Sequence, residues 1–114
     1  MKKTEFNISC PEWMGNELGV VVKKVKGCVM YFSDYYWGIH KSENENKFSA
    51  SELTTGFAMP DSYGKTIEET ISLLKRAVKK RREKMPKAIT ETKKYLKKKG
   101  IKFPVNNVKQ LQSI

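Results

Sequence analysis

The first sixty residues contain short apolar segments separated by polar turns, a pattern typical of β-strands. Gly19–Val25 is dominated by valine, Lys26-Gly27 has the composition of a turn, and Cys28–Phe32 forms a second apolar segment. We therefore predict a β-hairpin that turns at Lys26-Gly27.

Tyr35–His40 alternates its side chains between two faces, as a half-buried strand does. Whether this segment continues the preceding strand through Ser33-Asp34 stays open. Ser42–Asn46 is polar and predicts a turn, and Lys47–Leu53 predicts the next strand. Thr54-Thr55-Gly56 then predicts a further turn.

A helical pattern begins at Thr66. Thr66 and Glu69 have the spacing of a capping box, in which the threonine hydroxyl accepts a hydrogen bond from the amide three residues later. Apolar residues then recur at helical spacing, at Ile67, Ile71, Leu74 and Val78. This helix is expected to run to about Lys84, because Pro86 disfavours helical backbone at the residue before it.

A second helix is predicted after the proline, since Pro86 suits the first helical turn. Its apolar face would consist of Ala88, Ile89, Thr92, Tyr95 and Leu96. Gly100 is a suitable C-terminal cap. The chain from Lys102 on is predicted to be an irregular tail.

Strands followed by helices, rather than alternating with them, favour the α+β class. We predict one domain over residues 1–114, with a β-rich part over 1–60, two basic helices over 66–99 broken near Pro86, and an irregular tail over 102–114. The expected architecture is a three- or four-stranded antiparallel β-meander followed by a packed amphipathic helix and a second basic helix.

Charge changes this picture, because the net charge of +11 is unevenly distributed. Residues 1–60 carry seven lysines and seven acidic residues, whereas residues 61–114 carry 16 basic and 5 acidic residues. A field of one sign attracts polyanions, of which nucleic acid is the commonest. A membrane-surface role is disfavoured, since the apolar helix face carries Ile, Leu and Val and not Trp or Phe.

The basic side chains cluster on the predicted helices. On a helical projection, Arg76, Lys79 and Lys80 lie opposite the apolar stripe and Arg81 falls at its edge, so the run Lys79–Lys84 is expected to project into solvent. The predicted nucleic-acid-binding residues are Lys75, Arg76, Lys79, Lys80, Arg82, Lys87, Lys93, Lys94, Lys97 and Lys98. The alternative is a solvated face that keeps a small protein soluble. Acidic residues one helical turn away would favour that alternative, and only Glu83 and Glu91 interrupt the cluster.

The aromatic residues of the segment 31–37 are predicted to form mostly sheet core around Trp37, with Tyr36 as the most exposed and a candidate for base stacking. No motif surrounds His40, Cys10 or Cys28, so we expect no catalytic dyad and no metal site. Two cysteines are too few for a disulfide scaffold, and no apolar run reaches the length of a membrane span. We therefore expect a reduced, cytoplasmic protein that is not an enzyme and uses no cofactor.

Three segments together form a recognisable sequence pattern. Tyr36–Ile39, Phe48–Gly56 and Thr66–Thr70 resemble small phage and mobile-element accessory proteins, in which a strand ends in a Thr-Gly turn and a short loop leads to a helix opened by Thr-x-x-Glu. The resemblance covers about residues 35–78 and implies a compact sheet-plus-helix accessory protein. Most proteins of this kind have no assigned activity, so the resemblance assigns no site residues.

Two hypotheses follow. The first is a non-enzymatic accessory protein that binds nucleic-acid backbone, without sequence preference, through its C-terminal helices. The second is a phage-type interaction module or inhibitor that docks on an acidic surface of a host protein. An exposed edge strand such as Gly19–Val25 could also pair with a second copy to give a homodimer.

Overall fold

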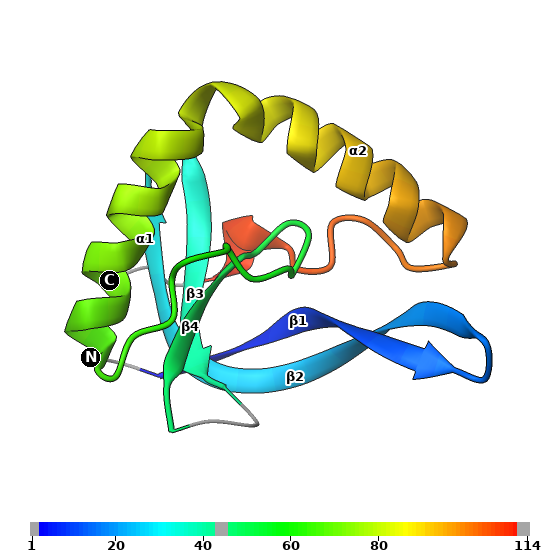
Figure 1. The fold of residues 1–114 in the computed structure, drawn as a ribbon, viewed down its shortest axis with the longest axis horizontal. Coiled ribbons are helices and arrows are strands. Elements are labelled where there is room, and N and C mark those ends of the chain that lie inside the picture. Colours follow the sequence, from blue (N-terminus) through cyan, green and yellow to red (C-terminus); the bar gives the residue numbers. More distant parts are fainter. Residues whose placement is uncertain (1–2, 43–45, 112–114) are drawn as a thin grey trace.

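The computed structural model describes residues 3–42 and 46–111, which form a four-stranded antiparallel sheet followed by helices. The sheet is a meander of β1 (Thr4–Met14), β2 (Glu17–Phe32), β3 (Tyr35–Lys41) and β4 (Phe48–Glu52), in that spatial order (Figure 1). The predicted α+β class is confirmed. The middle of the predicted turn Ser42–Asn46 lies outside the described residues.

The first hairpin turns at Gly15-Asn16, not at Lys26-Gly27 as predicted. Gly15 has a φ of +66° at the first central position, the requirement of a type II′ turn. Gly27 lies inside β2, where a Cβ atom would stand 2.0 Å from the carbonyl oxygen of Ile39 and 3.1 Å from the ring of Phe6. Gly27 therefore allows the neighbouring strands to approach β2 closely, and the predicted turn at Lys26-Gly27 is wrong.

The second hairpin settles the question that the pattern left open at Ser33-Asp34. Both residues have positive φ, 53° and 73°, as a two-residue type I′ turn requires. Tyr35 consequently begins a new strand that pairs with Phe32. Between residues 17 and 26, β2 pairs with β1 alone among the described strands, so Gly19–Val25 does retain one open edge.

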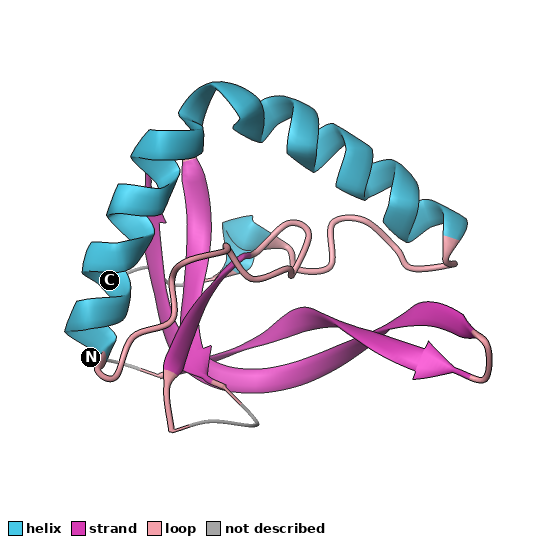
Figure 2. Ribbon diagram, viewed as in Figure 1, coloured by secondary structure: helices cyan, strands magenta, loops and turns pink. Residues whose placement is uncertain are grey.

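The sheet is strongly bent and carries an apolar cluster on each face (Figures 1 and 2). On one face, Trp37 and Ile39 pack against Leu74 and Val78 of α1 (Ile67–Arg81). On the other face the buried residues are Phe6, Ile8, Val29 and Leu53. Trp37 is fully buried, which confirms the predicted aromatic core at this position.

The helical part begins where predicted, since the Thr66 hydroxyl accepts a hydrogen bond of 3.0 Å from the amide of Glu69. The α-helical geometry of α1 ends at Arg81, three residues earlier than expected, and a 3₁₀ turn, η1 (Arg82–Lys84), leads into α2 (Met85–Lys98). Figure 1 shows α1 lying along the sheet while α2 arches away above it. None of the described helices is both long and apolar enough to cross a bilayer.

The segment after α2 returns to the sheet and connects β1 with the end of β4. The Asn106 side chain accepts a hydrogen bond of 2.7 Å from the amide of Asn7 and donates to the carbonyl oxygens of Asn7 and Leu53 at 2.9 and 2.7 Å. The amide of Val105 donates to the carbonyl of Thr54. Apart from the short 3₁₀ turn η2 (Val108–Gln110), this segment has little regular structure, yet it links β1 to the end of β4.

Candidate nucleic-acid interface and the polar cleft

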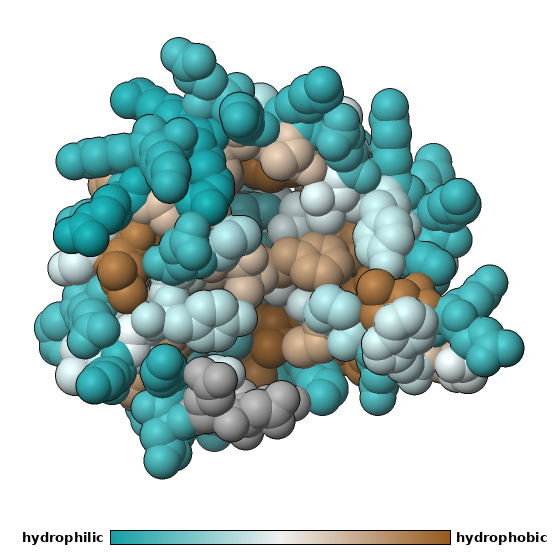
Figure 3. All heavy atoms as spheres, viewed as in Figure 1, coloured by the Kyte–Doolittle hydropathy of each residue, from teal (hydrophilic) through white to brown (hydrophobic). Residues whose placement is uncertain are grey.

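The helical basic surface consists of the ten side chains predicted to contact phosphates, and all ten are exposed. They lie on α1, η1 and α2. Figure 3 shows long hydrophilic side chains standing out over these helices, with apolar residues showing between them and over the sheet on this face of the molecule. The structure therefore brings the ten cations onto one connected helical segment.

These ten cations lack carboxylate partners within residues 3–42 and 46–111. A solvated face built for solubility commonly pairs each Lys or Arg with a Glu one turn away. Among the described residues, Glu83 and Glu91 lie on the same helical segment but form no ion pair with these cations, so the segment keeps a strong positive field. A polyanion that approaches several of these cations at once is attracted most strongly by such a field.

Arg81 differs from its neighbours. Its Nη2 lies 2.8 Å from Oδ2 of Asp61, in an ion pair that joins the end of α1 to the loop before it. This hydrogen bond and the positive charge of Arg81 hold the pKa of the Asp61 carboxyl below its usual value. The expectation that the whole run Lys79–Lys84 projects into solvent is therefore wrong at Arg81.

Two of the ten cations rest on aromatic rings. The Nζ atom of Lys75 lies 5.5 Å from the ring centre of Phe32, and that of Lys93 lies 5.3 Å from the ring centre of Phe103. Cation–π contacts of this kind restrict the side chains while leaving the ammonium groups exposed. Lys75 and Lys93 therefore hold more defined positions than freely rotating surface lysines do.

The dimensions of α2 suit a nucleic-acid backbone. Its 14 residues extend for about 21 Å at 1.5 Å per residue. One strand of B-form DNA carries a phosphate about every 3.4 Å along the axis, so this length matches about six phosphates. The lysines of α2 are thus spread over a distance that several phosphates of one strand occupy.

Tyr36, the candidate stacking residue, is half-buried. It packs edge-on against its cross-strand partner Tyr31, with ring centres 5.0 Å apart, and Tyr31 is the more exposed of the two at 52%. The prediction that Tyr36 is the most exposed of these aromatics is therefore wrong. The most exposed aromatic side chain in the described chain is Trp13, 71% exposed near the tip of the first hairpin, which the pattern did not single out.

Cys28 and His40 do not form a pair. Cys28 contributes to the cluster beneath α1, whereas His40 points from the opposite face of the sheet. His40 instead binds Ser51, with 2.9 Å between its Nε2 and the serine Oγ. No group of three or more His, Cys, Asp or Glu side chains that could hold a metal ion occurs among the described residues.

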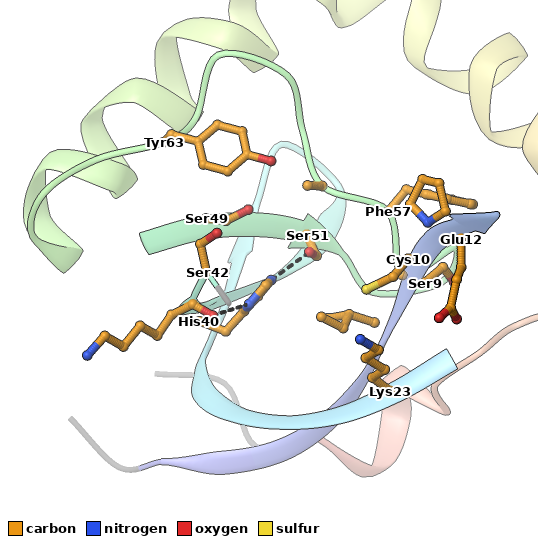
Figure 4. A pocket seen from close by; sticks show the side chains of 15 residues that line it. Ser9, Cys10, Glu12, Lys23, His40, Ser42, Ser49, Ser51, Phe57 and Tyr63 are labelled. Atoms are coloured by element: carbon orange, nitrogen blue, oxygen red, sulfur yellow. Dashed lines mark hydrogen bonds between the residues drawn. The ribbon is translucent and has the colours of Figure 1, made fainter. Parts of the chain in front are cut away.

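His40 and Ser51 border a cavity of about 530 Å³, the polar cleft, at the open end of the bent sheet. Figure 4 shows residues of β1, β3 and β4 and of the loop before α1 converging on it. The labelled residues around the cleft are Ser9, Cys10, Glu12, Lys23, His40, Ser42, Ser49, Ser51, Phe57 and Tyr63. Sequence reasoning missed this cleft, because its serines are spread over three segments without a motif.

A second cavity, the α2 groove, lies between α2 and the loop that follows β4. It measures about 580 Å³ and is lined mainly by apolar side chains, including Phe57, Met59 and Ile89. Lys80, Arg81 and Lys84 also line it. The groove thus places an apolar surface beside part of the helical basic surface.

Comparisons with protein-family models, with curated proteins and with solved structures found no match to this chain.

Proposed function

We propose that the protein binds the sugar-phosphate backbone of nucleic acid through the helical basic surface, as a non-enzymatic accessory protein. The observation that carries this proposal is the set of ten exposed cations that lack carboxylate partners in the described chain. Lys and Arg neutralise phosphates and release counterions, which gives affinity without a choice of sequence. The α2 length and the two ring-supported lysines add to the support.

Charge reversal tests this surface directly. The triple variant Lys79→Glu, Lys80→Glu and Arg82→Glu removes three cations at the junction of the helices and is expected to abolish binding to labelled DNA and RNA. Fluorescence anisotropy at low salt, with single- and double-stranded probes, measures the affinity. Because all three side chains are exposed, folding is expected to persist.

The matched control moves the same charge change to the sheet. Lys24, Lys26 and Lys41 are exposed on β2 and β3, and their replacement by Glu gives the same net charge as the helical triple variant. We expect this control to retain most of the affinity. Equal loss in both variants would show that only total charge matters, and an unchanged affinity in the helical variant would exclude the assigned surface.

A second candidate function, docking on an acidic protein, is favoured by the α2 groove. Its basic rim suits an acidic segment, and Nη1 of Arg81 is buried without a hydrogen-bond partner in the part of the chain that the structure describes. This hypothesis predicts a stoichiometric protein complex that forms in nuclease-treated lysate. The variant Ala88→Tyr, which fills the groove without changing the charge of α2, would disrupt that complex while leaving nucleic-acid binding intact.

A further inference from the structure

The polar cleft lies on the sheet face that elsewhere forms an apolar core. Toward one end this face carries Phe6, Val29 and Leu53, all buried. Toward the other end the same face carries His40, Ser49 and Ser51, which are equally buried but polar. Burying polar groups is costly unless they are hydrogen-bonded, so the partners of these three side chains decide what the cleft can bind.

His40 is held in one orientation and one tautomer. Its Nδ1 faces the carbonyl oxygen of Lys41 at 3.2 Å, and because a carbonyl only accepts, Nδ1 carries the proton. Nε2 therefore accepts from the Ser51 hydroxyl at 2.9 Å. Burial lowers the pKa of His40, although the hydrogen bond to Lys41 partly opposes this effect. The imidazole in the cleft is consequently neutral at physiological pH.

Ser49 is the least satisfied group in the cleft. Its side chain is 2% exposed, and its Oγ has no hydrogen-bond partner among the described residues. A hydroxyl both donates and accepts, so Ser49 offers two interactions to a molecule in the cleft. Ser42 and Tyr63, which Figure 4 shows on the same side, offer two more hydroxyls.

Aromatic and charged side chains also line the cleft. Phe57 and Tyr63 line it from the loop between β4 and α1, and Figure 4 shows them on different sides of the opening. Lys23 and Glu12 come from the first hairpin. The volume of about 530 Å³ falls in the range of small-molecule sites, which are common in the mouths of curved sheets.

We propose that the polar cleft binds a nucleobase. A base is a flat, neutral ring whose edges carry both hydrogen-bond donors and acceptors, which hydroxyls and a neutral imidazole can match. Its faces stack on aromatic rings irrespective of sequence. The fully buried polar groups of the cleft are neutral, which suits a neutral ring, and the charged residues of the lining are Glu12, Lys23 and Lys41.

The base has two sources, a free nucleotide or an unstacked base of a bound strand. Only the second source depends on the function proposed above, since the helical basic surface would then hold the strand. A free nucleotide would bind whether or not that surface contacts nucleic acid. The experiment therefore uses both probes on the full chain.

The test follows backbone amide signals by NMR while AMP, CMP, GMP and UMP are added separately at up to millimolar concentrations, and then a single-stranded oligonucleotide. We expect shifts centred on residues 40–51 with at least one probe. Shifts with a mononucleotide identify a nucleotide site, and shifts there with the oligonucleotide alone identify a base of a strand. No shifts at the cleft with any probe, or equal shifts with ribose, would overturn the proposal.

Ser49→Ala gives the decisive comparison. Because Oγ of Ser49 bonds to no described residue, its removal is expected to leave the melting temperature unchanged or slightly higher. The affinity for the base is expected to fall about five- to tenfold, the value of one lost hydrogen bond. Ser72→Ala, at an exposed position of α1, is the control.

Tyr63→Ala provides an independent check. Tyr63 is 47% exposed, so its removal takes away an aromatic wall without emptying the core. Affinity that is unchanged in both Ser49→Ala and Tyr63→Ala would overturn the assignment of the site. In the helical charge-reversal variant, mononucleotide shifts at the cleft are expected to persist, which separates failure of this inference from failure of the helical surface.

Discussion

At the scale of single residues, the alternation of side chains predicted burial well at one position and poorly at others. Trp37 lies on the face that α1 covers, so its burial follows from period and size alone. The exposure of Tyr31 and Tyr36 depends on their mutual packing across two strands, which a single segment does not reveal. Ser49 was unremarkable in the sequence, because only the bent sheet shows that its hydroxyl is buried with no partner among the described residues.

The burial of His40 predicts that the stability of the fold depends on pH. Folding lowers its pKa, chiefly through burial, so the unfolded chain binds the proton more readily than the folded chain does. Its contribution to stability is therefore complete above the unfolded pKa of about 6.5 and is lost as the pH falls through the lower, folded value. Each unit of lowering corresponds to about 1.4 kcal/mol.

Urea denaturation at a series of pH values between about 7.5 and 5 measures this effect, since only groups that titrate in that range contribute. Other titratable groups also line the cleft and could modify the curve, namely Cys10, Glu12, Lys23, Lys41 and Tyr63. His40→Gln is expected to lower stability at neutral pH and to flatten the pH dependence. An equally steep loss of stability in His40→Gln would assign the effect to another group.

At the scale of elements, the start of α1 was predictable and the first hairpin was not. The cap at Thr66 and the apolar spacing after it are local signals, and both describe α1 correctly. Glycine has two roles in a sheet, as a turn residue and as a site of close approach, and sequence does not separate them. Gly15 has the first role and Gly27 the second, so the turn was placed 11 residues too late and β1 was missed.

The hydrogen bonds of Asn106 lead to a prediction about the stability of the fold. Its side chain forms three hydrogen bonds that tie the segment after α2 to β1 and to the end of β4. Asn106→Ala would leave three buried or half-buried backbone groups without this partner, so we expect a loss of about 2–4 kcal/mol in the free energy of unfolding. Urea denaturation measures the loss.

Asn107→Ala is the control for this variant, because Asn107 is exposed and only caps the short η2 turn. It is expected to cost less than about 1 kcal/mol. If the two variants were equally stable, the link through Asn106 would contribute little to the fold.

At the scale of the whole molecule, the division of the sequence into a neutral and a positively charged half coincides with its division into sheet and helices. The half of the sequence without net charge supplies the sheet, and the half with a net charge of +11 supplies the helices and the segment after them. Composition alone indicated this asymmetry. It did not indicate the polar cleft, whose lining comes from four strands and a loop that are separated in sequence.

The asymmetry predicts the salt dependence of binding. If about five of the ten helical cations contact phosphates of duplex DNA, the logarithm of the association constant is expected to fall with a slope of about −4 to −5 against the logarithm of salt concentration. Anisotropy titrations over a salt series measure this slope. Single substitutions such as Lys94→Ala would reduce it by about 1, whereas Lys24→Ala would leave it unchanged; a slope near zero in the unaltered protein would argue against phosphate contacts.

The link between Asn7 and Asn106 also has a consequence for biosynthesis. These partners are 99 positions apart, so the first strand leaves the ribosome long before the residue that ties it down is made. The first hairpin must wait with an open edge and with Phe6 and Ile8, which the complete fold buries, still exposed, a state in which nascent chains attract chaperones or one another. Slow translation would prolong that wait, and fast translation through the lysine-rich stretch would shorten it.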